Sequence, residues 1–174
     1  MARLPFADID DPERAPIAAR IGEERGELLK LHQMLLHAPA IAEPWVGFFN
    51  GIRWNSGLSD DLRELVIMRI GHLNKAAYEV FQHRPYALKA GLSEEKLAVL
   101  GQDPLPGIFS AKEALVLDYC DAMTKSIAVD DALFERMRSA FSEPEIVELT
   151  TTIAAYNMVS RILVALEISP EDEA

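Results

Sequence analysis

Apolar residues return along this chain with the spacing of a helix. Between residues 62 and 81 the polar Arg69 interrupts a series that recurs every three or four positions: Leu62, Leu65, Val66, Ile70, Leu73, Ala76, Ala77, Val80 and Phe81. Ser59–Asp61 precedes the series as a helix cap, and Gly91 marks its end. The pattern predicts one long helix, kinked or ended at Pro85.

Proline, glycine and capping residues divide the rest of the chain into further helical segments. The predicted helices span Pro16–His37, Pro44 (or Ala40) to Trp54, Ser93–Leu100, Ser110–Lys125, Asp130–Ala140 and Ser142–Glu167. No segment alternates apolar and polar residues with period two, so the sequence predicts an all-α bundle of six to eight helices. We expect a single domain over residues 1–174, with an irregular arm at 1–12 and an acidic tail at 168–174.

Composition and charge limit the partners of such a bundle. Of 174 residues, 49% are hydrophobic, which is enough to fill one core. The chain has 17 basic and 28 acidic residues, a net charge of −11 that repels phosphate backbones and anionic lipid. We therefore expect no nucleic-acid or membrane partner, and a small anionic substrate would need a local cationic pocket. Without an apolar run of bilayer length or a leader pattern, the chain is predicted to be cytoplasmic.

Cysteine chemistry is narrowly restricted. Cys120 is the single cysteine, so the chain has neither an internal disulfide nor a CxxC redox pair. It lies within the predicted helix Ser110–Lys125, where a lone cysteine is typically a small buried hydrophobe.

Polar residues on the long central helix form the candidate site. If the helix is continuous, one side of it, opposite the apolar positions, carries Glu64, Met68, His72, Lys75, Glu79 and His83. Glu79 and His83 are one turn apart and can hydrogen-bond, which would raise the pKa of the imidazole and create a proton-transfer unit. The alternative is the ordinary polar surface of an amphipathic helix.

Metal binding is a second alternative for this pair. The Glu79–His83 spacing suits two ligands on one helix. Further ligands would have to come from His72, His32 or His37, and we predict no metal site.

A denser pattern joins these residues. The segment Leu58–Leu100 contains Ser59, Leu62-Arg63-Glu64-Leu65-Val66-Ile67, Asn74-Lys75-Ala76-Ala77-Tyr78-Glu79, His83 and Ala90-Gly91-Leu92-Ser93. It resembles the carboxymuconolactone decarboxylase family, which includes the AhpD-like alkylhydroperoxidases. The resemblance extends more loosely from Pro39 to Arg161 and implies an AhpD-like helical bundle.

The resemblance also separates two branches of that family. The peroxidase branch has a Glu, then a CxxC pair, then a His four residues after the second cysteine. Glu64 and His83 match the Glu and the His, whereas Ala76 and Glu79 stand at the cysteine positions. Disulfide exchange needs two thiols, so alkylhydroperoxidase activity of that kind is not expected. Tyr78-Glu79 before His83 resembles the decarboxylase-type, non-CxxC branch.

The resemblance implies a lyase that needs no cofactor and acts on a small carboxylated lactone from aromatic-compound breakdown. His83, partnered by Glu79, would donate a proton or stabilise an oxyanion, and Glu64 would orient a group or relay the proton. The predicted substrate-binding residues are Arg69, Lys75, Tyr78 and Arg84, with Arg53 as a further cation. Arg69 has a structural alternative, a salt bridge to an acid such as Glu148.

For quaternary structure and activity, the sequence allows more than one prediction. The resemblance implies a homo-oligomer, a trimer or a hexamer built from dimers, and Trp45, Phe48, Phe49 and Trp54 supply more aromatic surface than one core face needs. The alternatives to the lyase are another acid–base reaction and a non-catalytic oligomer that binds a small ligand.

Overall fold

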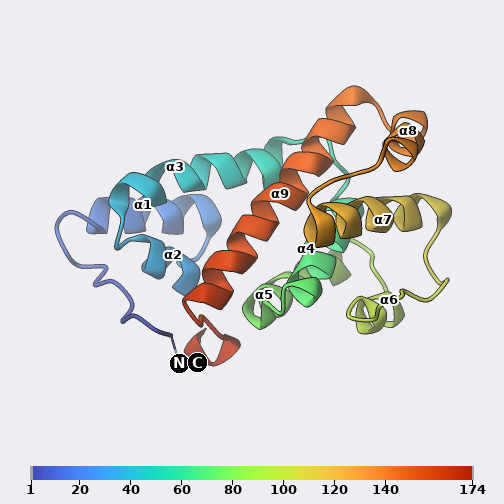
Figure 1. Cartoon of the computed structure of the whole chain (residues 1–174). Coiled ribbons are helices and arrows are strands. Elements are labelled where there is room, and N and C mark those ends of the chain that lie inside the picture. Colours follow the sequence, from blue (N-terminus) through green and yellow to red (C-terminus); the bar gives the residue numbers. More distant parts are fainter. Residues whose placement is uncertain (1, 174) are drawn as a thin grey trace. The chain divides into compact units, whose positions relative to one another are not determined.

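The chain is built from helices, as the sequence predicts. A computed structural model describes residues 2–173 (Figure 1), and the described residues include no β-strand. The elements are α1 (Ala15–Arg25), α2 (Lys30–Leu35), α3 (Pro39–Asn50), the π-helical turn η1 (Gly51–Asn55), α4 (Asp60–Leu73), α5 (Ala77–Lys89), α6 (Glu94–Val99), α7 (Ala111–Ser126), α8 (Asp131–Ala140), α9 (Glu143–Ala165) and the 3-10 turn η2 (Pro170–Glu173). Met1 and Ala174, the outer ends of the predicted arm and tail, lie outside the described residues.

The chain forms two compact units. One comprises residues 57–164, and the other comprises residues 2–56 together with 165–173. The single domain over 1–174 stays a prediction. Within residues 2–173, no helix combines the length and the apolarity that crossing a bilayer requires.

The unit of residues 2–56 and 165–173 corrects the predicted first helix. Gly26 takes a left-handed conformation with φ 82° and donates its N–H to the carbonyl of Gly22, which ends α1. The segment therefore divides into α1 and α2 where one helix is predicted. Pro39 stands in the first turn of α3, where its missing N–H has no helical partner to lose. One core cluster of this unit is aliphatic, with buried Ala7, Ala18, Ile21, Leu36, Ala42 and Val46.

The predicted long central helix is a helical hairpin of α4 and α5. Lys75 adopts φ 56°, its N–H bonds the carbonyl of His72, and the N–H of Ala76 bonds the carbonyl of Gly71 at 2.8 Å. This pair of bonds is a Schellman motif, which satisfies the last carbonyls of α4 and reverses the chain. A continuous helix was therefore the wrong prediction. Pro85 does not end α5, which continues to Lys89.

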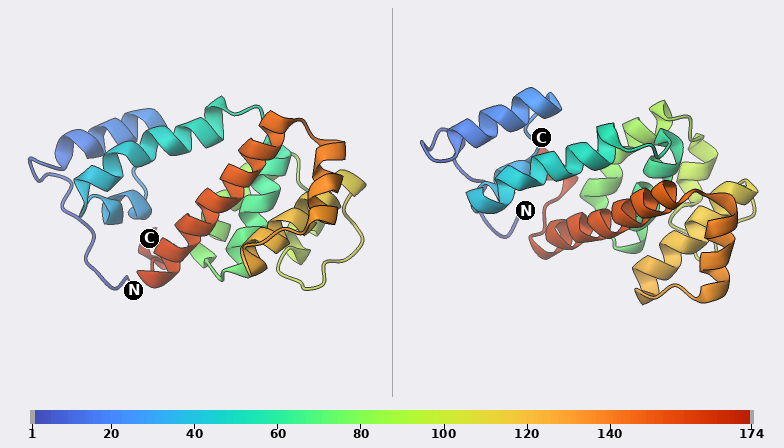
Figure 2. Two further views of the ribbon diagram at one scale, coloured as in Figure 1. Left: turned by 45° about the horizontal axis from the view of Figure 1, so that its top comes forward. Right: turned by 90° about the horizontal axis from the view of Figure 1, so that it is seen from above.

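Close packing holds the two arms of the hairpin together. A Cβ atom at Gly71 would approach Cγ2 of Val80 to 2.8 Å, so the backbone of α4 meets α5 at a distance that only glycine permits. Of the predicted apolar series, Leu65, Val66 and Ile70 on α4 are buried, as expected of core residues. Leu73 and Val80 are only partly buried and Phe81 is 52% exposed, so the end of α4 and this face of α5 do not form the predicted core. α4 also packs against α7 (Figure 2). The Tyr119 and Thr150 hydroxyls, 2.8 Å apart, join α7 to α9.

The helices after Gly91 follow the sequence prediction. Ser93, Ser110 and Asp130 each accept a backbone N–H at the start of α6, α7 and α8. The nine α-helices within residues 2–173 exceed the predicted six to eight because two predicted helices are each divided in two.

Candidate functional site

The three predicted catalytic residues meet inside the unit of residues 57–164. Glu64 comes from α4, and Glu79 and His83 come from α5, which the hairpin folds back onto α4. His83 Nδ1 lies 2.7 Å from Glu64 Oε2, and Nε2 lies 3.2 Å from Glu79 Oε1. All three side chains are buried, His83 being 5% exposed. One imidazole therefore bridges two carboxylates, an arrangement called the Glu–His–Glu cluster below.

Three neighbours complete the cluster, and the sequence reasoning assigned a role to none of them. Nε of the buried Arg63 lies 3.3 Å from Glu64 Oε1, while its Nη1 bonds Asp60 at 2.9 Å. The Tyr156 ring from α9 meets the His83 ring edge-on at 5.2 Å between centroids, and Tyr86 lies at 5.9 Å. Arg63 precedes Glu64 within the family-like motif, which is the signal that could have indicated it.

The two carboxylates control the protonation of His83. Burial alone lowers the pKa of the imidazole, but the charges and hydrogen bonds of Glu64 and Glu79 outweigh burial and raise that pKa above its ordinary 6.5. Both ring nitrogens face an acceptor oxygen, and a doubly protonated imidazolium satisfies both contacts. The arrangement can hold a proton in a buried place and release it.

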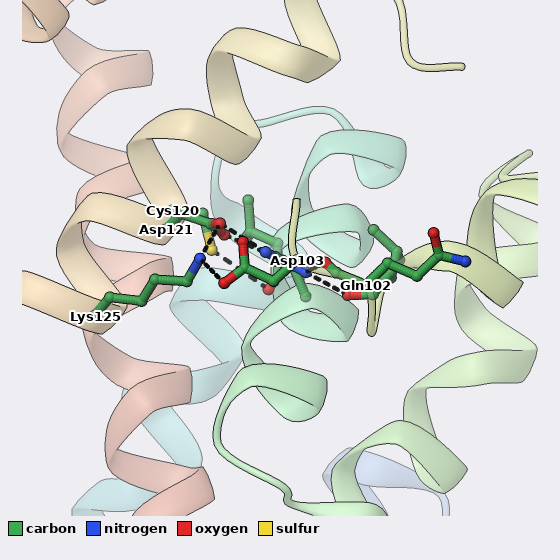
Figure 3. Close-up of polar contacts among 8 residues, drawn as sticks. Gln102, Asp103, Cys120, Asp121 and Lys125 are labelled. Carbon is green, nitrogen blue, oxygen red and sulfur yellow. Dashed lines mark hydrogen bonds and ion pairs between the residues drawn. The ribbon is translucent and has the colours of Figure 1, made fainter. Parts of the chain in front are cut away.

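Arg69 belongs to a structural network. It is fully buried, its Nε and Nη2 bond the two Asp121 oxygens at 2.7 and 2.6 Å, and its Nη1 bonds the carbonyls of Leu100 and Gln102 at 2.7 Å. Lys125 joins Asp121 to Asp103 in the same network (Figure 3). These four hydrogen bonds occupy the guanidinium, so the predicted role of Arg69 in substrate binding is wrong. The salt-bridge alternative is correct, with Asp121 in place of Glu148 as the acid.

Lys75 and Arg84 lie apart from the Glu–His–Glu cluster. They line a pocket of about 420 Å³ whose other lining residues are Gly71, His72, Ala77, Val80 and Phe81. None of the cluster residues lines it. Arg84 also pairs with Glu94 at the surface. The structure thus separates two predicted binding cations from the predicted catalytic residues.

The two other predicted binding residues occupy different places. Tyr78 is buried in the first turn of α5, directly before Glu79. Arg53 is buried in η1 with its guanidinium 5.0 Å from the centre of the Trp54 ring. Among residues 2–173, no three His, Cys, Asp or Glu side chains gather as a metal-binding group.

Cys120 is enclosed in α7. It is fully buried, and burial together with the neighbouring Asp121 raises the pKa of its thiol to about 12. Its Sγ lies 3.9 Å from the carbonyl oxygen of Val66. The reactive form of a cysteine is the thiolate, which this environment suppresses.

We expect a thiol reagent to leave native Cys120 unmodified. With a pKa of about 12, only about one thiol in ten thousand is ionised at pH 8. Ellman's reagent should therefore react with the one thiol per chain only after denaturation. The matched control is Ser126→Cys in a Cys120→Ala background, an exposed thiol on the same helix, which should react at once. Native Cys120 reacting as fast as that control would contradict the assignment.

Comparison with known proteins agrees with the fold. Residues 39–117, which include Glu64, Glu79 and His83, match the Carboxymuconolactone decarboxylase family. The uncharacterized protein YdfG from Bacillus subtilis is 27% identical over 113 residues, covering 64% of this chain and 77% of YdfG. Through residues 39–117, the chain is similar to the carboxymuconolactone decarboxylase family.

Solved structures share the helical architecture. A protein of unknown function from Agrobacterium tumefaciens, described as a candidate antioxidant-defence protein AhpD, superposes with a TM-score of 0.72 at 26% identity, covering 78% of this chain and 93% of its own. The alkylhydroperoxidase AhpD core protein from Ralstonia eutropha JMP134, an uncharacterized peroxidase-related protein, gives a TM-score of 0.81 at 18% identity and covers 99% of this chain and 93% of its own. The predicted AhpD-like fold is confirmed.

Proposed function

We propose that this protein is a cofactor-free lyase that decarboxylates or isomerises a small carboxylated lactone. The observation that carries the proposal is the buried Glu–His–Glu cluster, in which two carboxylates raise the pKa of His83. A histidine held as imidazolium near neutral pH is a general acid. The match of residues 39–117 to the carboxymuconolactone decarboxylase family supports the substrate class.

The cluster suits the proton transfer of that reaction. As the bond between the ring carbon and the substrate carboxylate breaks, carbon dioxide leaves and its bonding electrons move into the conjugated lactone carbonyl. The enolate then takes a proton on carbon, and we assign its delivery to His83. Glu79 and Glu64 hold the two ring nitrogens and stabilise the charged imidazole before the transfer. Arg63, 3.3 Å from Glu64, keeps that carboxylate oriented and adds positive potential for the developing oxyanion.

Assembly is part of the proposal. Phe48 and Trp54 are 47% and 56% exposed, whereas the neighbouring Trp45 and Phe49 are buried and stacked with centroids 4.4 Å apart. Exposed aromatic rings beside a packed pair are typical of contact surfaces between subunits. We therefore propose that the protein forms a homo-oligomer, either a trimer or a hexamer built from dimers. Light scattering in solution measures the mass of this assembly.

The test is a screen of carboxylated muconolactones together with lactones that lack the carboxylate. Ultraviolet absorbance should report turnover of a carboxylated compound, with release of one carbon dioxide per substrate in the decarboxylation. A His37→Gln variant, changed at an exposed histidine whose ring bonds the Pro5 carbonyl, should keep the native rate. The His83→Gln variant should lose it.

One observation favours an alternative. His83 is 5% exposed with both ring nitrogens held, and such a closed arrangement also suits a structural ion cluster in an oligomer that only binds a small ligand. Calorimetry on the same compounds separates the two: binding without turnover, unchanged in His83→Gln, would favour the ligand-binding protein. Turnover by His83→Gln at the native rate would contradict the role of His83 as the general acid.

A further inference from the structure

The pocket beside the α4–α5 turn, called the hairpin pocket here, has a composition unusual for this chain. Two cations, Lys75 and Arg84, line it, and no carboxylate does. The chain carries a net charge of −11, so most of its surface repels anions. The hairpin pocket is the kind of local cationic concavity that an anion would need.

The walls of the hairpin pocket are apolar. Val80, Ala77 and the 52% exposed Phe81 recur along one face of α5 together with Arg84, and Gly71 opens the facing wall on α4. His72 is half-buried, and burial and then the charge of Arg69 lower the pKa of its imidazole, so the ring is neutral at pH 7. A volume of about 420 Å³ lies within the range of small-molecule sites. An apolar body with one anionic group matches these walls and charges.

The hairpin pocket is separate from the Glu–His–Glu cluster. At 100° per residue, Glu79 and His83 point about 130° around α5 from the face that carries Val80 and Arg84. A molecule in the hairpin pocket therefore lies on a different side of α5 from the imidazole, and it touches the turn at Lys75 from which α5 starts.

We propose that the hairpin pocket is a second binding site, for a small aromatic or alicyclic monocarboxylate. Lys75 and Arg84 pair with the carboxylate, while Phe81 and Val80 cover the ring. Charge-assisted hydrogen bonds of this kind are stronger than neutral ones, so the carboxylate decides the affinity. The inference goes beyond the proposed function and does not depend on it, because no cluster residue takes part.

A variant of Glu94 should change carboxylate binding in the direction opposite to variants of Lys75 and Arg84. Glu94 is exposed and pairs with Arg84, so a bound carboxylate competes with it for the guanidinium. Removing the Glu94 charge should tighten binding, whereas removing either pocket cation should weaken it.

The experiment is calorimetric titration with naphthalene-2-carboxylate and, as its neutral isostere, naphthalene-2-carboxamide. We expect the carboxylate to bind at least about tenfold more tightly than the amide. Lys75→Asn and Arg84→Gln should each weaken carboxylate binding by about tenfold and leave the amide unchanged, and Glu94→Gln should tighten it. Asparagine accepts the left-handed conformation of position 75 more readily than lysine does, so that variant keeps its fold.

Lys89 supplies the matched control. It is an exposed cation on the same helix, outside the pocket, and Lys89→Gln should leave the affinity for the carboxylate unchanged. Methyl NMR signals of Ala77 and Val80 should shift on titration. Equal affinity for carboxylate and amide, no binding at millimolar concentration, or an equal loss in Lys89→Gln and Arg84→Gln would each overturn the proposal.

Discussion

Replacement of His83 by glutamine is expected to remove turnover and to destabilise the protein at the same time. A positioned general acid contributes about 10²- to 10⁴-fold to a rate, and kcat should fall by that factor. The change also leaves two buried carboxylates facing a neutral amide, and breaking a buried ion pair from one side costs about 3–5 kcal/mol. Urea unfolding near pH 6 measures the second effect.

The pH dependence of unfolding tests the same cluster. Because the pKa of His83 in the folded protein is raised above 6.5, the stabilisation from its ion pairs is complete below pH 6.5 and is lost as the pH rises through the raised pKa. The difference in free energy of unfolding between wild type and His83→Gln should therefore shrink on the alkaline side. A difference that grows with pH would contradict the assignment.

A double variant separates chemistry from structure. His83→Gln combined with Glu79→Gln removes the surplus buried carboxylate along with the imidazole, so stability should largely return. Turnover should not return, because no acid faces the substrate. Activity that recovers together with stability would mean that His83 supports the fold and takes no part in the reaction.

Replacement of Arg69 by methionine is expected to cost about 3–5 kcal/mol with little direct effect on the chemistry. The change deprives Asp121 of two hydrogen bonds and leaves the carbonyls of Leu100 and Gln102 without their donor. Burial by itself raises the pKa of Asp121, and Arg69 and Lys125 together hold it below its usual value. Chemical denaturation at pH 7 measures the loss.

A surface pair provides the comparison for Arg69. Arg136 on α8 pairs with Asp118 at 3.2 Å, and both side chains are more than half exposed. Arg136→Met should change the free energy of unfolding by no more than about 0.5 kcal/mol, since exposed ion pairs contribute little. Equal losses in the free energy of unfolding for the Arg69 and Arg136 variants would show that the buried network stabilises the fold no more than a surface ion pair does.

The sequence predicted the helices that begin at strong caps and end at clear breakers. Ser110 and Asp130 stand at the caps predicted for α7 and α8, and Gly91 with φ 97° follows the end of α5. The reversal at Lys75 escaped prediction because a left-handed lysine carries no sequence signal, and the apolar periodicity continues through it. Tertiary packing of α5 on α4 stabilises a turn that local preference does not favour.

The candidate site was predicted in its residues but not in its geometry. Glu64, Glu79 and His83 were placed on one face of a continuous helix, and they meet instead across a hairpin. Arg69 interrupts an apolar series, which gives no information on whether its partner is a substrate or Asp121. Tyr156 joins the cluster from α9, and periodicity along one helix cannot indicate such a contact between different elements.

The glycine at position 71 has a consequence for how this hairpin can vary. Since a methyl group there would already collide with Val80, a larger residue at 71 is compatible with the hairpin only if residue 80 becomes smaller. Without that exchange the helices must separate, and the 2.7 Å contact between His83 and Glu64 would lengthen with them. The distance between His83 and Glu64 thus depends on the absence of a side chain at Gly71. Substitutions at 71 and 80 are expected to be coupled in their effects on both stability and rate.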